Sequence, residues 1–88
     1  IERFPQQPVV VDSAAWVYYK LGDYALARDL LLGVKDKLDK IPIGQYHLGM
    51  ACLKLDDRRQ AKEWLAKSVS SKEEFSGRKN ALKLLKTL

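Results

Sequence analysis

Residues 20–31, KLGDYALARDLL, return 34 positions later, at residues 54–65, as KLDDRRQAKEWL. The correspondence extends outward without a gap to Pro8 and Pro42. It comprises nine pairs, six identical and three conservative: Pro8 with Pro42, Val9 with Ile43, Lys20 with Lys54, Leu21 with Leu55, Asp23 with Asp57, Ala27 with Ala61, Arg28 with Lys62, Asp29 with Glu63 and Leu31 with Leu65. A constant period of this length is typical of stacked structural repeats, so we expect copies of one unit.

The first unit is predicted to form two helices. The first helix, about 8–21, begins at Pro8, whose fixed φ suits a first helical turn, and its apolar residues recur three and four positions apart. Gly22 and Asp23 separate the two helices, because glycine tolerates a positive φ and an aspartate side chain can cap the next helix. The second helix is expected at about 24–38.

The second unit repeats this plan, with helices predicted at about 42–55 and 58–70. Its inner turn must form without glycine, because Asp56 stands where the first unit has Gly22. Small residues occupy equivalent places in the two units and leave room for helices to approach closely. These small residues are Ala15, Ala27, Gly49 and Ala61.

Two stretches, YKLGDYALARDLLLGV (residues 19–34) and HLGMACLKLDDRRQAKEWLAKS (residues 47–68), resemble the tetratricopeptide repeat family. The family carries Leu-Gly in its first helix, Gly-Asp-Tyr at the turn and alanines at set spacings in the second helix. This chain departs from the pattern at Val34, where a small residue is usual, and at Cys52, where tyrosine is usual. Its sequence over residues 16–24 and 46–57 is similar to that of bacterial members, including those of exopolysaccharide and exosortase-linked export systems.

The resemblance implies an all-α fold, a right-handed α-solenoid of two helix pairs followed by a capping helix. The pairs correspond to residues 8–41 and 42–75 and the cap to residues 76–88, with Phe75 tucking its loop against the second pair. Residues 1–7 resemble the tail of a preceding repeat. Because the sequence also starts without Met, we interpret the chain as a piece of a longer protein.

The family resemblance further implies a non-catalytic interaction scaffold that binds a peptide or protein segment in a concave groove lined by the first helix of each unit. Aromatic and thioether side chains there are typical of binding hot spots. An alternative is that some of these side chains only pack between units. The predicted groove residues are Asp12, Trp16, Tyr19, Lys20, Tyr46, His47, Met50 and Lys54.

The sequence gives little support for a catalytic site or a metal site. Ser13, His47 and Asp12 suggest a serine–histidine–acid set, but the acid lies beside the serine in sequence rather than behind the histidine. His47 and Cys52 are five residues apart, about 140° around a helix, so they cannot share a metal. As the single cysteine, Cys52 excludes an internal disulfide and is expected to be a small buried hydrophobic residue. No cofactor is expected, and no apolar run is long enough to span a membrane.

The net charge of +5 lies wholly in residues 45–88, which carry ten basic and five acidic side chains. A basic C-terminal face is therefore an alternative docking surface for an anionic polymer, although no aromatic residue is interleaved with the lysines of the cap, which makes nucleic acid an unlikely partner. A third possibility is homo-oligomerisation, such as a homodimer, through the apolar face at the start of the first unit. Bacterial cytoplasm and cell envelope are both compatible locations.

Overall fold

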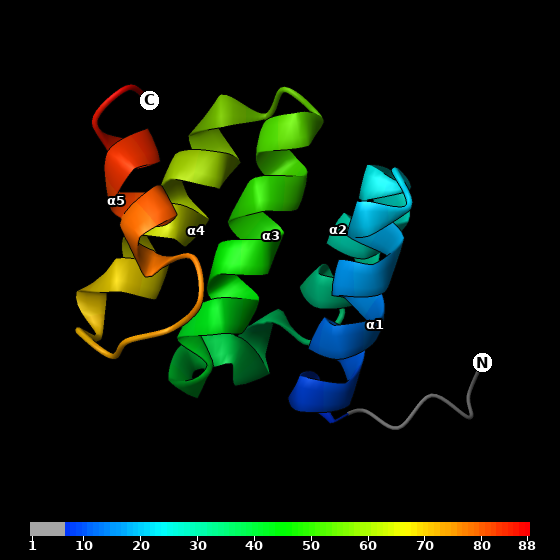
Figure 1. Cartoon of the computed structure of the whole chain (residues 1–88). Coiled ribbons are helices and arrows are strands. Elements are labelled where there is room, and N and C mark those ends of the chain that lie inside the picture. Colours follow the sequence, from blue (N-terminus) through cyan, green and yellow to red (C-terminus); the bar gives the residue numbers. More distant parts are fainter. Residues whose placement is uncertain (1–6) are drawn as a thin grey trace.

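The computed structural model describes residues 7–88, and within this range it contains helices and no strand. The prediction of an all-α fold is confirmed. Expectations about residues 1–6, including a preceding repeat's tail, lie outside the described residues. The helices are α1 (Pro8–Lys20), α2 (Tyr24–Leu32), the 3₁₀ helix η1 (Lys35–Lys40), α3 (Pro42–Lys54), α4 (Arg58–Ser70) and α5 (Arg78–Leu85) (Figure 1).

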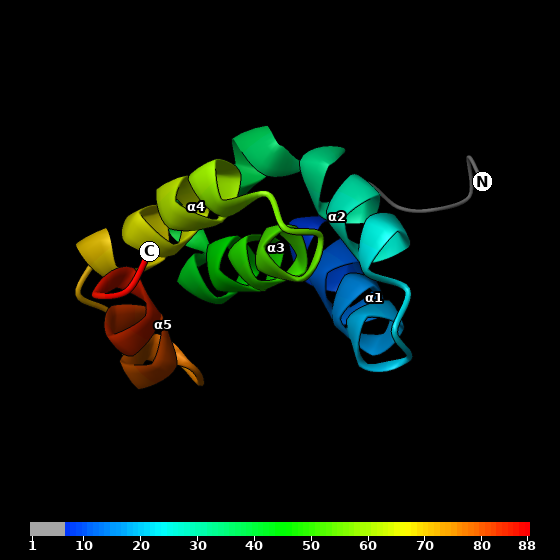
Figure 2. The ribbon, with the colours of Figure 1, turned by 90° about the horizontal axis from the view of Figure 1, so that it is seen from above.

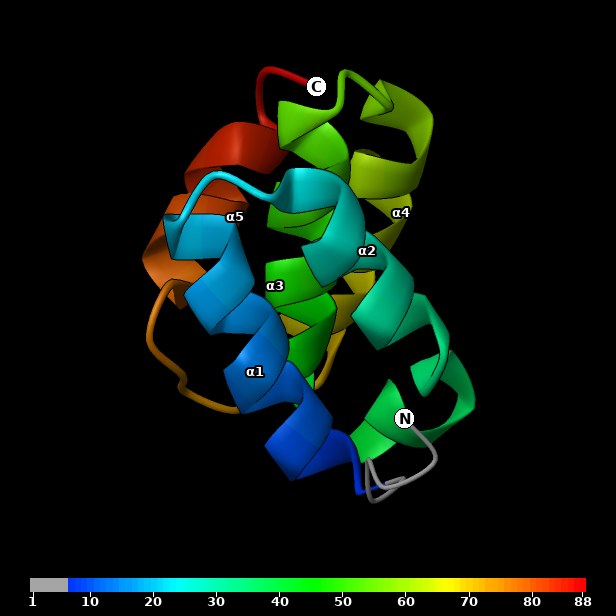
Figure 3. The ribbon, with the colours of Figure 1, turned by 90° about the vertical axis from the view of Figure 1, so that its right-hand side faces the viewer.

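The helices form two layers. In Figure 2, α1, α3 and α5 lie along one side, which we call the inner layer, and α2 and α4 along the other, the outer layer. Helix α3 is central, because it packs against α1, α2 and α4 and also touches α5. Figure 3 shows α1 and α2 lying together over one side of α3.

The two units use the same device to turn from their first helix into their second. Asp23 and Asp57 each accept a hydrogen bond from a backbone N–H three residues later, at 3.2 Å in both cases, and thereby cap α2 and α4. The residue before each cap lies in the left-handed region, with φ of 91° at Gly22 and 65° at Asp56. The second turn therefore forms without glycine, because an aspartate tolerates this conformation better than most residues.

Close helix packing depends on the small residues that the repeat places at equivalent positions. Ala15, Ala27 and Ala61 are at most 1% exposed. A Cβ atom on Gly49 would lie only 2.9 Å from Cδ2 and Cγ of Leu65 on α4. Helices α3 and α4 can therefore approach as they do only because residue 49 has no side chain.

The second helix of the first unit is shorter than predicted. Instead of continuing to residue 38, α2 ends at Leu32, and the chain turns through Gly33 into η1. Glycine weakens a helix, and Ile41 before Pro42 must leave the helical region, so the chain changes direction over these residues. Val34 and Leu38 nevertheless enter the core, with exposures of 4% and 0%.

Helix α5 packs against α4 and forms one end of the inner layer. Phe75, in the loop before it, lies with its ring centroid 5.7 Å from that of Tyr46, so the predicted contact with the second unit forms. Arg78 turns back toward the end of α4, where its guanidinium donates to the carbonyl oxygen of Val69 at 3.4 Å. A cation at a helix C-terminus is favourable, so this contact helps to hold α5 on α4.

Candidate functional site

A row of ring contacts runs from Tyr24 on α2 across α1 to His47 on α3. The ring of Trp16 stacks on Tyr19 with centroids 4.3 Å apart and on His47 with centroids 3.8 Å apart. Tyr19 in turn meets the ring of Tyr24 edge-on, with centroids 5.1 Å apart. We call Trp16, Tyr19 and Tyr24 the aromatic row. All three rings are half-buried, so each is held by its neighbours and still presents surface to solvent.

Two exposed lysines border the aromatic row. The ammonium nitrogen of Lys20 lies 5.9 Å from the ring centroid of Trp16, and that of Lys54 lies 5.8 Å from the ring centroid of Tyr24. At this range a cation is attracted to an aromatic face. Lys20 and Lys54 are equivalent residues of the two units, so the repeat itself places two positive charges beside the rings.

A buried polar contact supports the aromatic row from beneath. The Nδ1–H group of His47 on α3 donates to Oδ1 of Asp12 on α1 at 2.7 Å, and both side chains are less than 10% exposed. Because the two helices belong to different units, this bond fixes one unit against the next. It also fixes the plane of the imidazole on which Trp16 stacks.

The expectation of open groove positions is wrong for Asp12, Tyr46 and His47, which are 6%, 7% and 6% exposed. Tyr46 is covered by the C-terminal segment: Asn80 donates to its hydroxyl at 2.9 Å, and Gly77, with φ of 103°, packs against its ring. A helical wheel gives the direction of a side chain, but the cover comes from residues about 30 positions away in sequence.

Met50 lies half-buried beside Tyr46, with its sulfur 4.0 Å from the side-chain nitrogen of Asn80. Burial first, and then the neighbouring Tyr24 and Tyr46, raise the pKa of Tyr19. Of the groove residues predicted from the sequence, five lie on accessible parts of the inner layer: Trp16, Tyr19, Lys20, Met50 and Lys54. Tyr24 is not among the residues predicted from the sequence, although its place directly after Gly22 and Asp23 in the turn motif could have indicated it.

Residues 44–75, which contain most of α3 and all of α4, match the family model of the tetratricopeptide repeat. This segment is a tetratricopeptide repeat. Searches of curated proteins and of solved structures gave no significant match. Tetratricopeptide repeats are generally protein-interaction modules, commonly bind proteins or peptides, and are typically non-catalytic.

The tetratricopeptide repeat has a counterpart in α1 and α2. Pro8 and Pro42 begin the first helix of each pair, and Asp23 and Asp57 cap the second. Among residues 7–88 no helix is long and apolar enough to cross a membrane. In the same range no three His, Cys, Asp or Glu side chains are grouped so that they could hold a metal ion. Cys52 is fully buried, as the sequence predicts.

Proposed function

We propose that the chain is a non-catalytic binding module that holds a peptide or protein segment against the aromatic row of its inner layer. Exposed lysines beside half-buried rings are the observation that carries this proposal. The rings offer rigid apolar contact area at a low cost in conformational entropy, which is why aromatic side chains dominate binding hot spots.

The chemistry of this surface favours a partner segment with an apolar or aromatic side chain next to a carboxylate. The apolar group would lie on Trp16 and Tyr19, while Lys20 and Lys54 would face the carboxylate. Asp12 and His47 serve this surface as positioning residues, because their buried bond orients the imidazole beneath Trp16. Tyr46 has a structural role in the proposal, since it is covered by residues of the C-terminal segment.

Selection from a random heptapeptide phage library, followed by fluorescence anisotropy with the enriched peptides, tests the proposal. We expect enriched peptides to pair an aromatic or aliphatic residue with Asp or Glu. Trp16→Ala should weaken their binding at least tenfold, in line with hot-spot truncation. Lys20→Gln should weaken it about two- to fivefold, in line with exposed ion pairs.

Lys62→Gln is the matched control, because Lys62 is an exposed lysine on α4 away from the aromatic row. Circular dichroism establishes that each variant keeps its helices. Peptides that bind Trp16→Ala as tightly as the parent chain would refute the proposal for the inner layer.

A second candidate function, self-association, is favoured by an exposed apolar face on α1. Val17, Tyr18 and Leu21 are 57%, 38% and 74% exposed. Thirty-four residues on, Ala51 and Cys52, the equivalents of Val17 and Tyr18, are fully buried on α3, over which α1 and α2 lie (Figure 3). The same register position is thus covered in one unit and open in the other. We propose that a second copy of the chain covers it, pairing identical faces around a two-fold axis.

Sedimentation velocity over a range of concentrations tests this proposal. The parent chain should form a dimer as concentration rises, and Leu21→Lys should shift the equilibrium to monomer. Lys62→Ala, an exposed change on α4, should leave the dimer intact. A parent chain that stays monomeric at millimolar concentration would refute self-association.

A further inference from the structure

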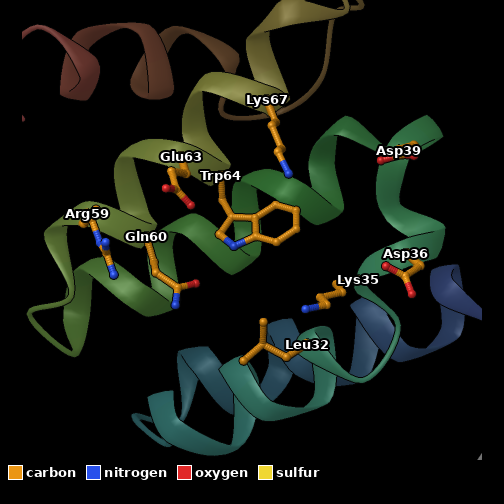
Figure 4. A pocket seen from close by; sticks show the side chains of 9 residues that line it. All are labelled: Leu32, Lys35, Asp36, Asp39, Arg59, Gln60, Glu63, Trp64 and Lys67. Atoms are coloured by element: carbon orange, nitrogen blue, oxygen red, sulfur yellow. The ribbon is translucent and has the colours of Figure 1, made fainter.

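A groove of about 700 Å³ lies on the outer layer, between α2 with η1 on one side and α4 on the other (Figure 4). Its position follows from the packing of the helices: α2 lies against α1 and α3, while α4 lies against α3 and α5. Helix α2 ends at Leu32, and η1, which follows it, supplies Lys35, Asp36 and Asp39 to the same wall of the groove. None of the residues predicted for binding lines this groove.

The apolar part of the groove is formed by Leu32 from α2 and Trp64 from α4. Trp64 is 8% exposed, so its position is fixed by the core. The ammonium nitrogen of Lys67 lies 4.4 Å from the centroid of its ring. In Figure 4 the indole lies centrally, between residues of the two walls, where the side chain of a ligand could reach it.

The outermost charged side chains differ in sign at the two ends of the groove, with Glu63 beside Arg59 and Lys35 beside Asp36. Figure 4 shows Arg59 and Gln60 at one end and Asp36 and Asp39 at the other, with Trp64 between them. In the part of the chain that the structure describes, the side chains of Asp36, Asp39 and Arg59 have no hydrogen-bonding or ion-pair partner. They are therefore free to pair with charges on a ligand.

The groove as a whole is electrically balanced. It is lined by three basic and three acidic side chains: Lys35, Arg59 and Lys67, and Asp36, Asp39 and Glu63. A ligand carrying several charges of one sign would meet like charges in the groove. A ligand with one charge of each sign, held apart by an apolar group, would complement both ends and the indole.

We propose that this groove is a second binding site, for an extended peptide segment with a basic side chain, an apolar side chain and an acidic side chain in succession. The basic group faces Asp36 and Asp39, the apolar group packs on Trp64 and the acidic group faces Arg59. Along α4 the groove runs from residue 59 to residue 67, about 12 Å at 1.5 Å per residue. An extended peptide covers this distance in about four residues.

Trp64 itself supplies the assay. The chain has two tryptophans, so in a Trp16→Phe chain all tryptophan fluorescence comes from Trp64. The probe is the peptide acetyl-Lys-Gly-Leu-Gly-Asp-amide, which holds its two charges four residues apart. Its titration should change the emission of Trp64 saturably. The same peptide with Lys at both ends, or Asp at both ends, should bind at least threefold more weakly.

Variants on the rim locate the site. Arg59→Gln, and Asp36→Asn combined with Asp39→Asn, should each weaken binding about two- to fivefold, as expected for exposed ion pairs, and added salt should remove the difference. Lys62→Gln and Glu73→Gln are matched controls, because both residues are exposed and lie outside the groove. No saturable change in emission, equal binding of the singly signed peptides, or equal losses in the controls would each overturn the proposal.

Discussion

Replacement of Gly49 by leucine tests the close approach of α3 and α4 directly. Even a Cβ atom at this position would lie 2.9 Å from two side-chain atoms of Leu65 and 3.2 Å from its backbone nitrogen. Leu65 is itself fully buried, and a backbone atom cannot move aside as the end of a flexible side chain can. We therefore expect Gly49→Leu to force the two helices apart rather than to be absorbed locally.

The expected loss in the free energy of unfolding follows from two opposing effects. Overpacking a filled core costs about 1–3 kcal/mol or more, whereas replacing glycine inside a helix recovers up to about 1 kcal/mol. For Gly49→Ala these effects leave a net loss of about 0–2 kcal/mol, and for Gly49→Leu a loss of about 2 kcal/mol or more. In a domain of this size, 1 kcal/mol shifts the midpoint of thermal unfolding by about 4–8 °C.

Thermal and urea unfolding followed by circular dichroism measure this loss. Ala66→Leu is the matched control, because Ala66 is exposed on α4 and the change adds a leucine side chain outside the core. If Gly49→Leu unfolded within 3 °C of Ala66→Leu, the inference that residue 49 sets the spacing of α3 and α4 would be wrong.

Three further predictions concern single residues. Asp23→Ala and Asp57→Ala should each lower the free energy of unfolding by about 1 kcal/mol, measured in urea, because each removes the cap of an outer-layer helix. Asp12→Ala should cost about 1–3 kcal/mol in the same assay, because it leaves the buried His47 without its partner, whereas Asp12→Asn, which keeps an acceptor, should cost less. Burial, with a smaller contribution from Asp57, raises the pKa of Cys52 from 9.0 to about 11. The folded chain therefore holds a proton that the unfolded chain releases between these values, so stability should fall as pH rises from 9 through 11, and urea unfolding of Cys52→Ala should show a shallower fall.

The sequence predicts the helix pairs well, because the 34-residue period repeats both the helix starts and the caps. Pro8, Pro42, Asp23 and Asp57 act within their own first turns, so each signal is local and can be recognised without knowledge of the rest of the fold. The buried alanines are likewise predictable, since a small residue at an equivalent place in two units marks a contact of helices.

The repeat pattern predicts neither the burial of Tyr46 nor the groove at Trp64, and the reason is the same for both. Tyr46 is covered because Gly77 takes a positive φ and brings the C-terminal segment onto its ring. The outer groove is lined in part by η1, which replaces the predicted end of α2. Both features depend on where the chain leaves regular helix, and a repeat pattern says little about such places.

The polar contacts of the inner layer limit how the units can slide. Asp12 bonds to His47, one residue beyond its own equivalent, and Tyr46 bonds to Asn80, which stands 34 residues farther along the chain. A shift of either helix interface by one helical turn would move the two hydrogen-bonding side chains about 5 Å apart. It would leave a donor or an acceptor without a partner. Apolar packing alone tolerates such slippage more readily than these directional bonds do. The two bonds therefore fix the register of α1 on α3 and of α5 on α3, so the rings of the inner layer keep their relative positions.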